Sequence, residues 1–384
     1  MSTSCRKYIF LIVLSVLCNV LGYGRDVRIG LLSYEDLFSL TVKIQSGQYR
    51  LSAGGRVLTL NPGGNILVTK AGERLFVSVA GQETIVSDSL ILRHSEGADA
   101  VFSLRNNIVP GPPMQYNDDL VVKPGIRSLL AVNVVDINRY LAGVVQSEAG
   151  YKGSLEYFKA QAVIARTYFY MHSDRHMQDG YNICDRTHCQ VYKGMSVTEI
   201  INNAVLITEG MVLTNKDSIL VFTPFHANCG GQTEVSGNVW LNDEGHLKSV
   251  TDPYCGFSAS AAWSREISLK KWLDYLSGHG YRHSKSSDLG FDQLSRKKYY
   301  RAGEFVFPLS KIRLDWDLRS AFFSVEVKDS SVYLDGRGYG HGVGLCQDGA
   351  RVMADRGFRM REILNFYFSG LLVMDIKDAQ ADLM

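Results

Sequence analysis

A glycine-rich run at residues 336–350, GRGYGHGVGLCQDGA, constrains the fold of this chain more than any other segment. Glycines occupy positions 336, 338, 340, 342 and 344, and one imidazole, His341, stands among them. Because glycine has no Cβ, this alternation clears one backbone edge and lets a bulky ligand approach the main chain. A helix expected from Gln347 to about residue 356 would direct free amides at such a ligand. A plain turn between a strand and a helix explains the pattern equally well, and the absence of a GK[ST] ending argues against a phosphate loop.

A second segment, NVVDINRYLAGVVQSEAG at residues 133–150, predicts a short amphipathic helix. Asp136 is its expected N-cap, and the glycine at its end is a typical stop signal. Apolar residues recur at helical spacing and share one face with Glu148: Ile137, Leu141 and Val144. Glu148 is therefore expected on the buried side of the last turn.

That position gives Glu148 an expected chemical role. Desolvation and the negative end of the helix dipole both raise the proton affinity of a carboxylate. A glutamic acid that stays protonated near neutral pH can donate its proton to a glycosidic oxygen. The simpler interpretation is a helix-end glutamate that bends toward water or pairs with Lys159 or Arg166.

Composition narrows the class of protein. The chain has 384 residues and ordinary apolar content, which suits two lobes with a large core. The net charge is only +2 and the basic residues are scattered, so no nucleic-acid partner is expected. Twenty tyrosines against four tryptophans suit a groove that binds sugars, although structural tyrosines are common in β domains.

The N-terminus predicts export. Basic residues precede an apolar run at residues 8–21, and Gly-Tyr-Gly follows at 22–24. This order is typical of a signal peptide, and the run is short for a membrane span. We expect residues 1–24 to be a signal peptide or anchor and the protein to work in the periplasm or cell envelope.

The cysteines leave two interpretations open. Five remain after the export segment, at positions 184, 189, 229, 255 and 346, and an odd number cannot all pair internally. One or two disulfides with a free thiol is the first interpretation. The second is a metal site built from Cys184, Cys189 and a nearby imidazole, His176 or His172.

The remaining pattern predicts an α+β fold, with a mixed sheet-and-helix core and a small N-terminal β-rich lobe. Residues 25–118 contain short alternating segments separated by glycine-rich turns, for example at 41–45, 56–60 and 74–79. Residues 119–384 would form the catalytic domain, with a variable insertion near 279–301. Within it we expect a helix from Ser154 to about 172, a helix at 269–276, and strands at 312–318 and 322–327.

Several motifs, each weak alone, occur here in a specific order. They are NRYLAGVVQSE, LEYFKAQAVIARTY, CDRTHCQVYKG, FHANCGGQTE, DPYC and the glycine–histidine run, followed by EILNFYFSG. From about residue 119 to 372 this order resembles the stage II sporulation protein D (SpoIID) family. Cys346, Phe225 and Asp348 depart from residues common in that family.

The resemblance implies peptidoglycan lytic transglycosylases, which leave an anhydro sugar end, or related amidase enhancers. It places the acid/base role on Glu148, a supporting role on Lys159, and functional imidazoles at His188 and His341. It also implies a structural zinc at Cys184 and Cys189, with no cofactor required for the chemistry. The implied partners are glycan strands and either a wall amidase or the division machinery at the septum.

One carboxylate suffices for this chemistry if the C6 hydroxyl of the sugar is the nucleophile. Neutral polar groups would then orient the transition state. The candidates for sugar contact, besides Lys159, are His188, Gln190, His226, Gly230, Gly231, His341, Gly342 and Gln347. A wall-binding module without activity and a zinc hydrolase remain the alternatives.

Overall fold

The computed structural model describes residues 26–33, 35–95, 99–282 and 289–380. The predicted signal segment lies outside these residues. Sheets and helices are both abundant, so the predicted α+β class is confirmed. The chain divides into two compact units, residues up to 140 with 174–195, and residues 141–173 with 196–384. Across the described ranges, every helix falls short of the length and apolar character needed to cross a bilayer.

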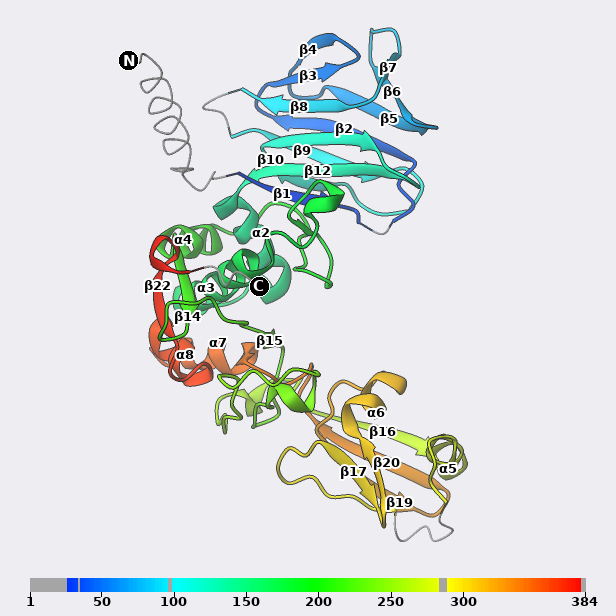
Figure 1. The fold of residues 1–384 in the computed structure, drawn as a ribbon, viewed down its shortest axis with the longest axis vertical. Coiled ribbons are helices and arrows are strands. Elements are labelled where there is room, and N and C mark those ends of the chain that lie inside the picture. The colour runs from blue at the N-terminus through cyan, green and yellow to red at the C-terminus, as the bar shows by residue number, and fades with distance from the viewer. Residues whose placement is uncertain (1–25, 34, 96–98, 283–288, 381–384) are drawn as a thin grey trace, which may run out of the picture. The chain divides into compact units, whose positions relative to one another are not determined.

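The first unit contains two large sheets (Figure 1). The strands of the seven-stranded sheet are, in order, β13 (Ile183–Cys184), β1 (Asp26–Leu31), β12 (Leu129–Asp136), β11 (Asp119–Pro124), β8 (Leu90–His94), β3 (Tyr49–Ala53) and β4 (Arg56–Leu60). Those of the six-stranded sheet are β10 (Met114–Asn117), β9 (Val101–Asn106), β2 (Ser39–Ser46), β5 (Asn65–Ala71), β6 (Arg74–Val79) and β7 (Ile85–Ser87). Neighbouring strands are antiparallel except β1 and β13, which run parallel.

Alternating side chains explain why these segments form half-buried strands. In β2, Leu40, Val42 and Ile44 are fully buried while the residues between them reach solvent. Aromatic side chains connect the two sheets, since the rings of Tyr49 in β3 and Phe102 in β9 lie 6.3 Å apart. Strands β2, β4 and β6 confirm the three segments that the sequence predicted.

Two helices follow β12. The first, α2 (Ile137–Ala149), begins where predicted, because Asp136 Oδ1 accepts hydrogen bonds from the amides of Asn138 (2.9 Å) and Arg139 (3.3 Å). The second, α3 (Leu155–His172), also has the predicted bounds. Ser154 occupies its N-cap position, but the Ser154 side chain makes no capping hydrogen bond.

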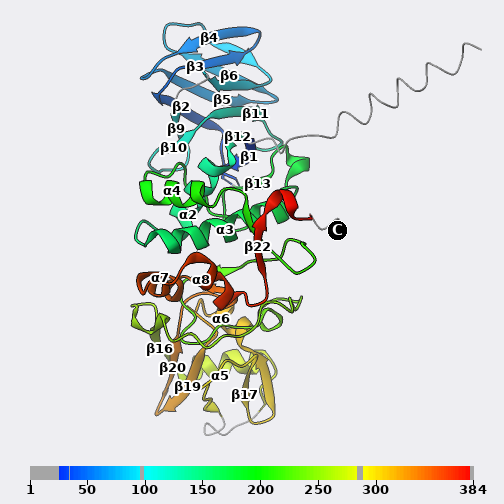
Figure 2. The ribbon, with the colours of Figure 1, turned by 90° about the vertical axis from the view of Figure 1, so that its left-hand side faces the viewer.

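In the second unit, α3 is the central element. It packs against α4 (Glu199–Ile207), β14 (Met211–Thr214), α7 (Gln347–Asp355) and α8 (Met360–Tyr367), and β14 pairs with β22 (Leu372–Asp375) (Figure 2). Arg166 on α3 is fully buried and donates hydrogen bonds to the carbonyls of Val205, Thr208 and Met211. Arg166 therefore holds α3 to α4 and β14, and is not a solvated cation.

Residues 262–334 build a core of their own within the second unit. It consists of β16 (Ala262–Ser268), α5 (Leu269–Gly278), β17 (Tyr299–Ala302), β18 (Phe305–Pro308), α6 (Leu309–Asp315), β19 (Phe323–Lys328) and β20 (Ser331–Arg337). Trp272, Tyr300 and Leu334 lie at its centre, fully buried. Tyr281, Leu289 and Phe291 from the predicted insertion belong to the same core, while residues 283–288 are outside the described ranges. The predicted domain boundaries stay a prediction.

The predicted strand at 312–318 is wrong. Its alternating pattern suggested a half-buried strand, but the structure forms α6, in which Leu309 and Ile312 are buried and Leu314 is 72% exposed. Pro308 takes the N-cap position with φ −64°, and two buried residues three positions apart then satisfy a helix. The predictions for α5 and β19 are confirmed, and Ser268 caps α5 by accepting from the Lys271 amide.

Short elements complete the chain. The two-residue strands β15 (Phe225–His226) and β21 (Leu345–Cys346) pair in parallel, and they lie in the segments that carry the candidate imidazoles. Single 3-10 turns are η1 (Met177–Asp179), η2 (Ser236–Asn238), η3 (Cys255–Phe257) and η5 (Ile376–Asp378).

Candidate functional site

Glu148 lies in the last turn of α2, as predicted, and is half-buried. Its backbone carbonyl accepts a hydrogen bond of 3.1 Å from Nε2 of Gln347, the first residue of α7. Gln347 directly follows β21 and lies within the glycine–histidine run. The turn that carries the predicted acid is therefore bonded to that run.

The alternating glycines serve the packing of the chain itself. A Cβ on Gly344 would lie 2.1 Å from the carbonyl oxygen of Pro224, and one on Gly338 would lie 2.6 Å from that of Asn228. Gly336, Gly340 and Gly342 would meet side chains of the protein at 2.8 Å or less. The freed backbone edge is thus filled by protein, chiefly the 224–230 segment, and not open to a bulky ligand as the sequence suggested.

This close packing brings two imidazoles together. The rings of His226 and His341 lie 5.5 Å apart, and both are held by the main chain of Val343: His226 Nδ1 bonds its carbonyl at 3.0 Å, and His341 Nδ1 accepts from its amide at 3.0 Å. Burial, reinforced by Arg313, lowers the pKa of His341 to about 4. Burial and the neighbouring His341 also lower the pKa of His226 well below its usual value. Both imidazoles are therefore neutral at neutral pH.

Aromatic side chains continue from His341 toward α3, and sequence reasoning missed them. Trp240 lies 5.1 Å from the His341 ring and 5.4 Å from Phe222, and Phe222 lies 6.4 Å from both Tyr168 and His172 on α3. Tyr168, His172, Phe222, Trp240 and His341 are half-buried residues. Because Trp240 stands about a hundred residues before the glycine–histidine run, no local sequence pattern signalled this contact.

Three other predicted contact residues have partners inside the protein. Lys159 Nζ donates to Glu156 Oε1 at 2.7 Å, and although burial opposes it, this bond helps to lower the pKa of Glu156. The Gly230 amide donates to Asn228 Oδ1 at 2.8 Å, and the Gly231 amide donates to Cys255 Sγ at 3.2 Å. These amides stabilise their own loop, so they are poorly placed to act as donors to a sugar.

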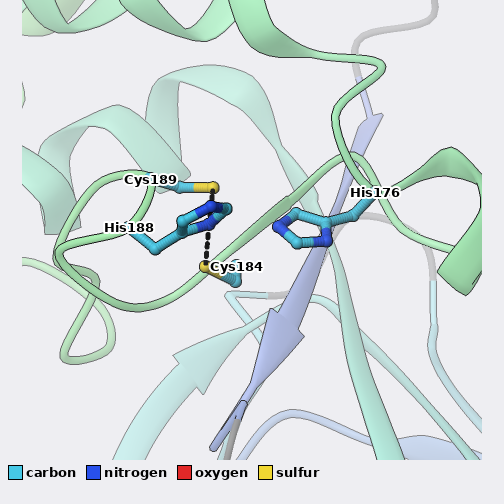
Figure 3. Close-up of side chains that lie close together, drawn as sticks. All are labelled: His176, Cys184, His188 and Cys189. Atoms are coloured by element: carbon cyan, nitrogen blue, oxygen red, sulfur yellow. Dashed lines mark hydrogen bonds between the residues drawn. The ribbon is translucent and has the colours of Figure 1, made fainter.

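The predicted metal ligands lie together in the first unit (Figure 3). Ligand atoms of His176, Cys184, His188 and Cys189 all lie within 4.8 Å of one another. Pairing of Gly30 with Cys184 fixes β13 beside β1, and His176 stacks on Tyr181 with ring centroids 5.0 Å apart. His172, the alternative ligand, is outside this group, and its Nδ1 lies 2.9 Å from the Tyr168 carbonyl.

The donor set fits zinc. Two thiolates and two imidazoles are a common tetrahedral zinc set. Among the residues that the structure describes, His176 Nε2 is buried with no hydrogen-bond partner, while Nδ1 lies 2.9 Å from Asp179 Oδ2. A carboxylate on one imidazole nitrogen orients the other toward a metal. A hydrogen bond from the Cys184 thiol, supported by Arg175, lowers the pKa of Cys189 to about 6, while the same bond and burial raise the pKa of Cys184.

The structure places His188 and Gln190 differently from a pair of sugar contacts. His188 is exposed, and its Nδ1 lies 3.5 Å from Cys189 Sγ and 3.8 Å from Cys184 Sγ, so its imidazole belongs with the metal ligands. Gln190 is buried, and its Oε1 accepts from Tyr140 Oη at 3.2 Å. Sugar binding by His188 or Gln190 stays a prediction.

Comparisons with known proteins match the region of the chain that carries these motifs. The family model described as stage II sporulation protein matches residues 126–215, which hold Glu148, Lys159 and the His188 loop. The stage II sporulation protein D of Bacillus amyloliquefaciens is 28% identical over 272 residues, 65% of this chain and 77% of the relative. An uncharacterized protein of Brachyspira hyodysenteriae is 27% identical over 273 residues, 68% and 73% of the two chains. These findings support the resemblance to the stage II sporulation protein D family.

A further relative carries a different name. An amidase enhancer of Bacillus subtilis is 30% identical over 286 residues, which cover 60% of this chain and 39% of the enhancer. The chain thus spans well under half of that longer protein. The likeness to the SpoIID family together with this match supports a role related to the cell wall.

Proposed function

We propose that this SpoIID-like protein is a peptidoglycan lytic transglycosylase in which Glu148 is both the acid and the base. The observation that carries the proposal is the half-buried Glu148 at the end of α2, in a turn bonded through Gln347 to the glycine–histidine run. Restricted access to water favours the protonated carboxyl group that this chemistry needs.

The reaction uses one carboxyl group twice. Glu148 donates its proton to the oxygen between N-acetylmuramic acid and N-acetylglucosamine, and the bond from C1 to that oxygen breaks. The C6 hydroxyl of the muramic sugar bonds to C1, and the Glu148 carboxylate takes the hydroxyl proton. No water is consumed, the products are an anhydro end and a free glucosamine end, and the enzyme is ready for the next cycle.

The surroundings suit an oxocarbenium-like transition state. His226 and His341 are neutral, so they can orient sugar hydroxyls without placing a cation beside the positive charge that develops at C1. The half-buried rings of Phe222 and Trp240 offer apolar faces along which a glycan could lie. A zinc ion held by the His176 group would crosslink the 176–189 loop and is assigned no step in the reaction.

The test is digestion of purified glycan strands, with products identified by mass spectrometry. We expect Glu148→Gln to keep the fold, judged by its melting curve, and to lose at least about a hundredfold in the rate of anhydro product formation. Glu199→Gln is the matched control, because Glu199 is an exposed helical glutamate on α4 and loses the same charge. Unchanged anhydro product from Glu148→Gln would remove Glu148 from this role.

A second function is favoured by the 30% identity to an amidase enhancer. In that case the protein would bind glycan and stimulate a separate wall amidase without cutting glycan. Purified protein that releases no fragment from glycan strands, with or without stem peptides, yet accelerates an added amidase would establish this function in place of the first.

A further inference from the structure

A second group of thiols lies deep in the second unit and has no part in the proposed reaction. Ligand atoms of Cys229, Asp252, Cys255 and Cys346 all lie within 4.8 Å of one another, and all four residues are buried. They come from three segments of the chain: the loop after β15, residues 252–255 at the start of η3, and the end of β21. We call these four residues the buried thiol cluster.

The spacing of the sulfur atoms suits a shared ion better than a disulfide. Cys229 Sγ and Cys255 Sγ are 3.3 Å apart. A disulfide requires about 2.05 Å, whereas two thiolates on one tetrahedral zinc, each at about 2.3 Å from the metal, are about 3.8 Å apart. Asp252 Oδ2 lies 3.2 Å from Cys229 Sγ and completes a set of four possible ligands.

Hydrogen bonds from the protein already point at these ligand atoms. The Gly231 amide donates to Cys255 Sγ at 3.2 Å, and the Cys229 and Gly349 amides donate to Cys346 Sγ at 3.3 and 3.4 Å. Tyr367 Oη donates to Asp252 Oδ2 at 2.9 Å. Donors of this kind orient metal ligands and stabilise them in the anionic form.

Burial makes a counter-charge necessary if these groups ionise. All four side chains are buried, so none of them has solvent at hand to compensate a charge. An anionic group without solvent is costly unless a cation compensates it. No salt bridge to Asp252 occurs among the described residues. Arg296 donates to the Cys229 carbonyl at 2.8 Å and lies 3.9 Å from the Glu234 carboxylate.

We propose that Cys229, Asp252, Cys255 and Cys346 bind a structural zinc ion, at a site separate from the His176 group. Three sulfurs and one oxygen suit zinc among the common divalent ions, and four protein ligands leave no open position for catalysis. The ion would fix the strands that carry the active imidazoles, because Cys346 pairs in register with His226, and Cys229 follows His226 by three residues.

The test uses the full chain and measures zinc by mass spectrometry of the metal. We expect Cys184→Ser/Cys189→Ser protein to retain one zinc per chain, with X-ray absorption showing three sulfurs at about 2.3 Å and one lighter ligand. Adding Cys255→Ser to this variant should remove that zinc.

A second measurement avoids any variant of the cluster that fails to fold. Cobalt(II) loaded into Cys184→Ser/Cys189→Ser protein should give the intense near-ultraviolet absorption of thiolate ligands, one ion per chain. If Cys184→Ser/Cys189→Ser itself fails to fold, wild-type protein should bind two cobalt ions with thiolate absorption for each. The proposal would be overturned if wild-type protein bound only one equivalent of zinc and only one of cobalt. A Cys229–Cys255 disulfide, found by peptide mapping of protein prepared with zinc, would also overturn it.

Discussion

The two groups of thiols in this protein differ in how the chain assembles them. The His176 group comes from one short stretch, residues 176–189, and His188 is exposed. The buried thiol cluster comes from segments as much as 117 residues apart, and each of its side chains is closed off from solvent. A local loop can present ligands to the surface, whereas ligands brought together by tertiary packing become part of the core.

This contrast predicts two rates of metal loss, the largest effect we expect. When zinc-loaded protein meets a chelator, the His176 group should release zinc first and the buried thiol cluster later. Loss of the second ion should cost on the order of 4 kcal/mol of unfolding free energy if zinc is present at a thousand times its Kd. Zinc release followed with a chromogenic chelator, beside melting curves, measures both. Zinc release in a single phase, with no change in the melting curve, would contradict this difference between the two groups.

Acid should weaken the region around the imidazoles of the second unit. His341 has a pKa lowered to about 4 in the folded protein, against about 6.5 when unfolded. The unfolded chain therefore binds more protons between these values, so stability is complete above about pH 6.5 and is lost as the pH falls toward 4. The His341 contribution is about 3 kcal/mol.

Denaturant unfolding at several pH values checks this. His341→Gln keeps a side-chain acceptor for the Val343 amide but cannot titrate, so its stability should change less between pH 6.5 and 4 than that of the wild type. If stability falls equally with pH in the wild type and in His341→Gln, protonation of His341 is not the cause of the acid effect.

Glycines in the second unit should tolerate alanine only where no distant segment approaches. Gly344 and Gly231 both have positive φ, at 73° and 95°, so alanine costs about 1–2 kcal/mol of strain at either. Only at Gly344 would the new Cβ meet the Pro224 carbonyl, at 2.1 Å, whereas Gly231 has open space. Gly344→Ala should therefore be less stable than Gly231→Ala by about 2 kcal/mol in urea unfolding. Equal losses of stability in the two variants would mean that the segment at Pro224 moves aside without cost.

The smallest effect separates two N-caps of neighbouring helices. Asp136→Ala should cost about 1 kcal/mol, because the Asp136 side chain bonds two amides at the start of α2. Ser154→Ala should cost close to nothing, since in the described structure the buried Ser154 hydroxyl has no hydrogen-bond partner. Thermal unfolding of both variants measures this, and a larger loss at Ser154 would contradict the capping geometry.

The sequence predicted best what depends on near neighbours. Asp136, the bounds of α2 and α3, the place of Glu148 and the closeness of Cys184 to Cys189 all follow from spacings of a few residues. It failed at 312–318, where alternation favoured a strand but packing of Leu309 and Ile312 selected a helix. It also missed Trp240 and the partners of the alternating glycines, because those contacts join segments far apart in the chain.

By itself, the sequence determined the mixed α+β character, the resemblance to the SpoIID family, and the place of a glutamate at the end of a helix, since helical periodicity and motif order are local properties. Only the tertiary structure decided that other segments of the chain pack against the glycines and that His226 lies beside His341. It also decided that three cysteines far apart in the sequence gather with Asp252 in one buried cluster. Burial and close packing select such arrangements, and neither is encoded in the spacing of residues along the chain.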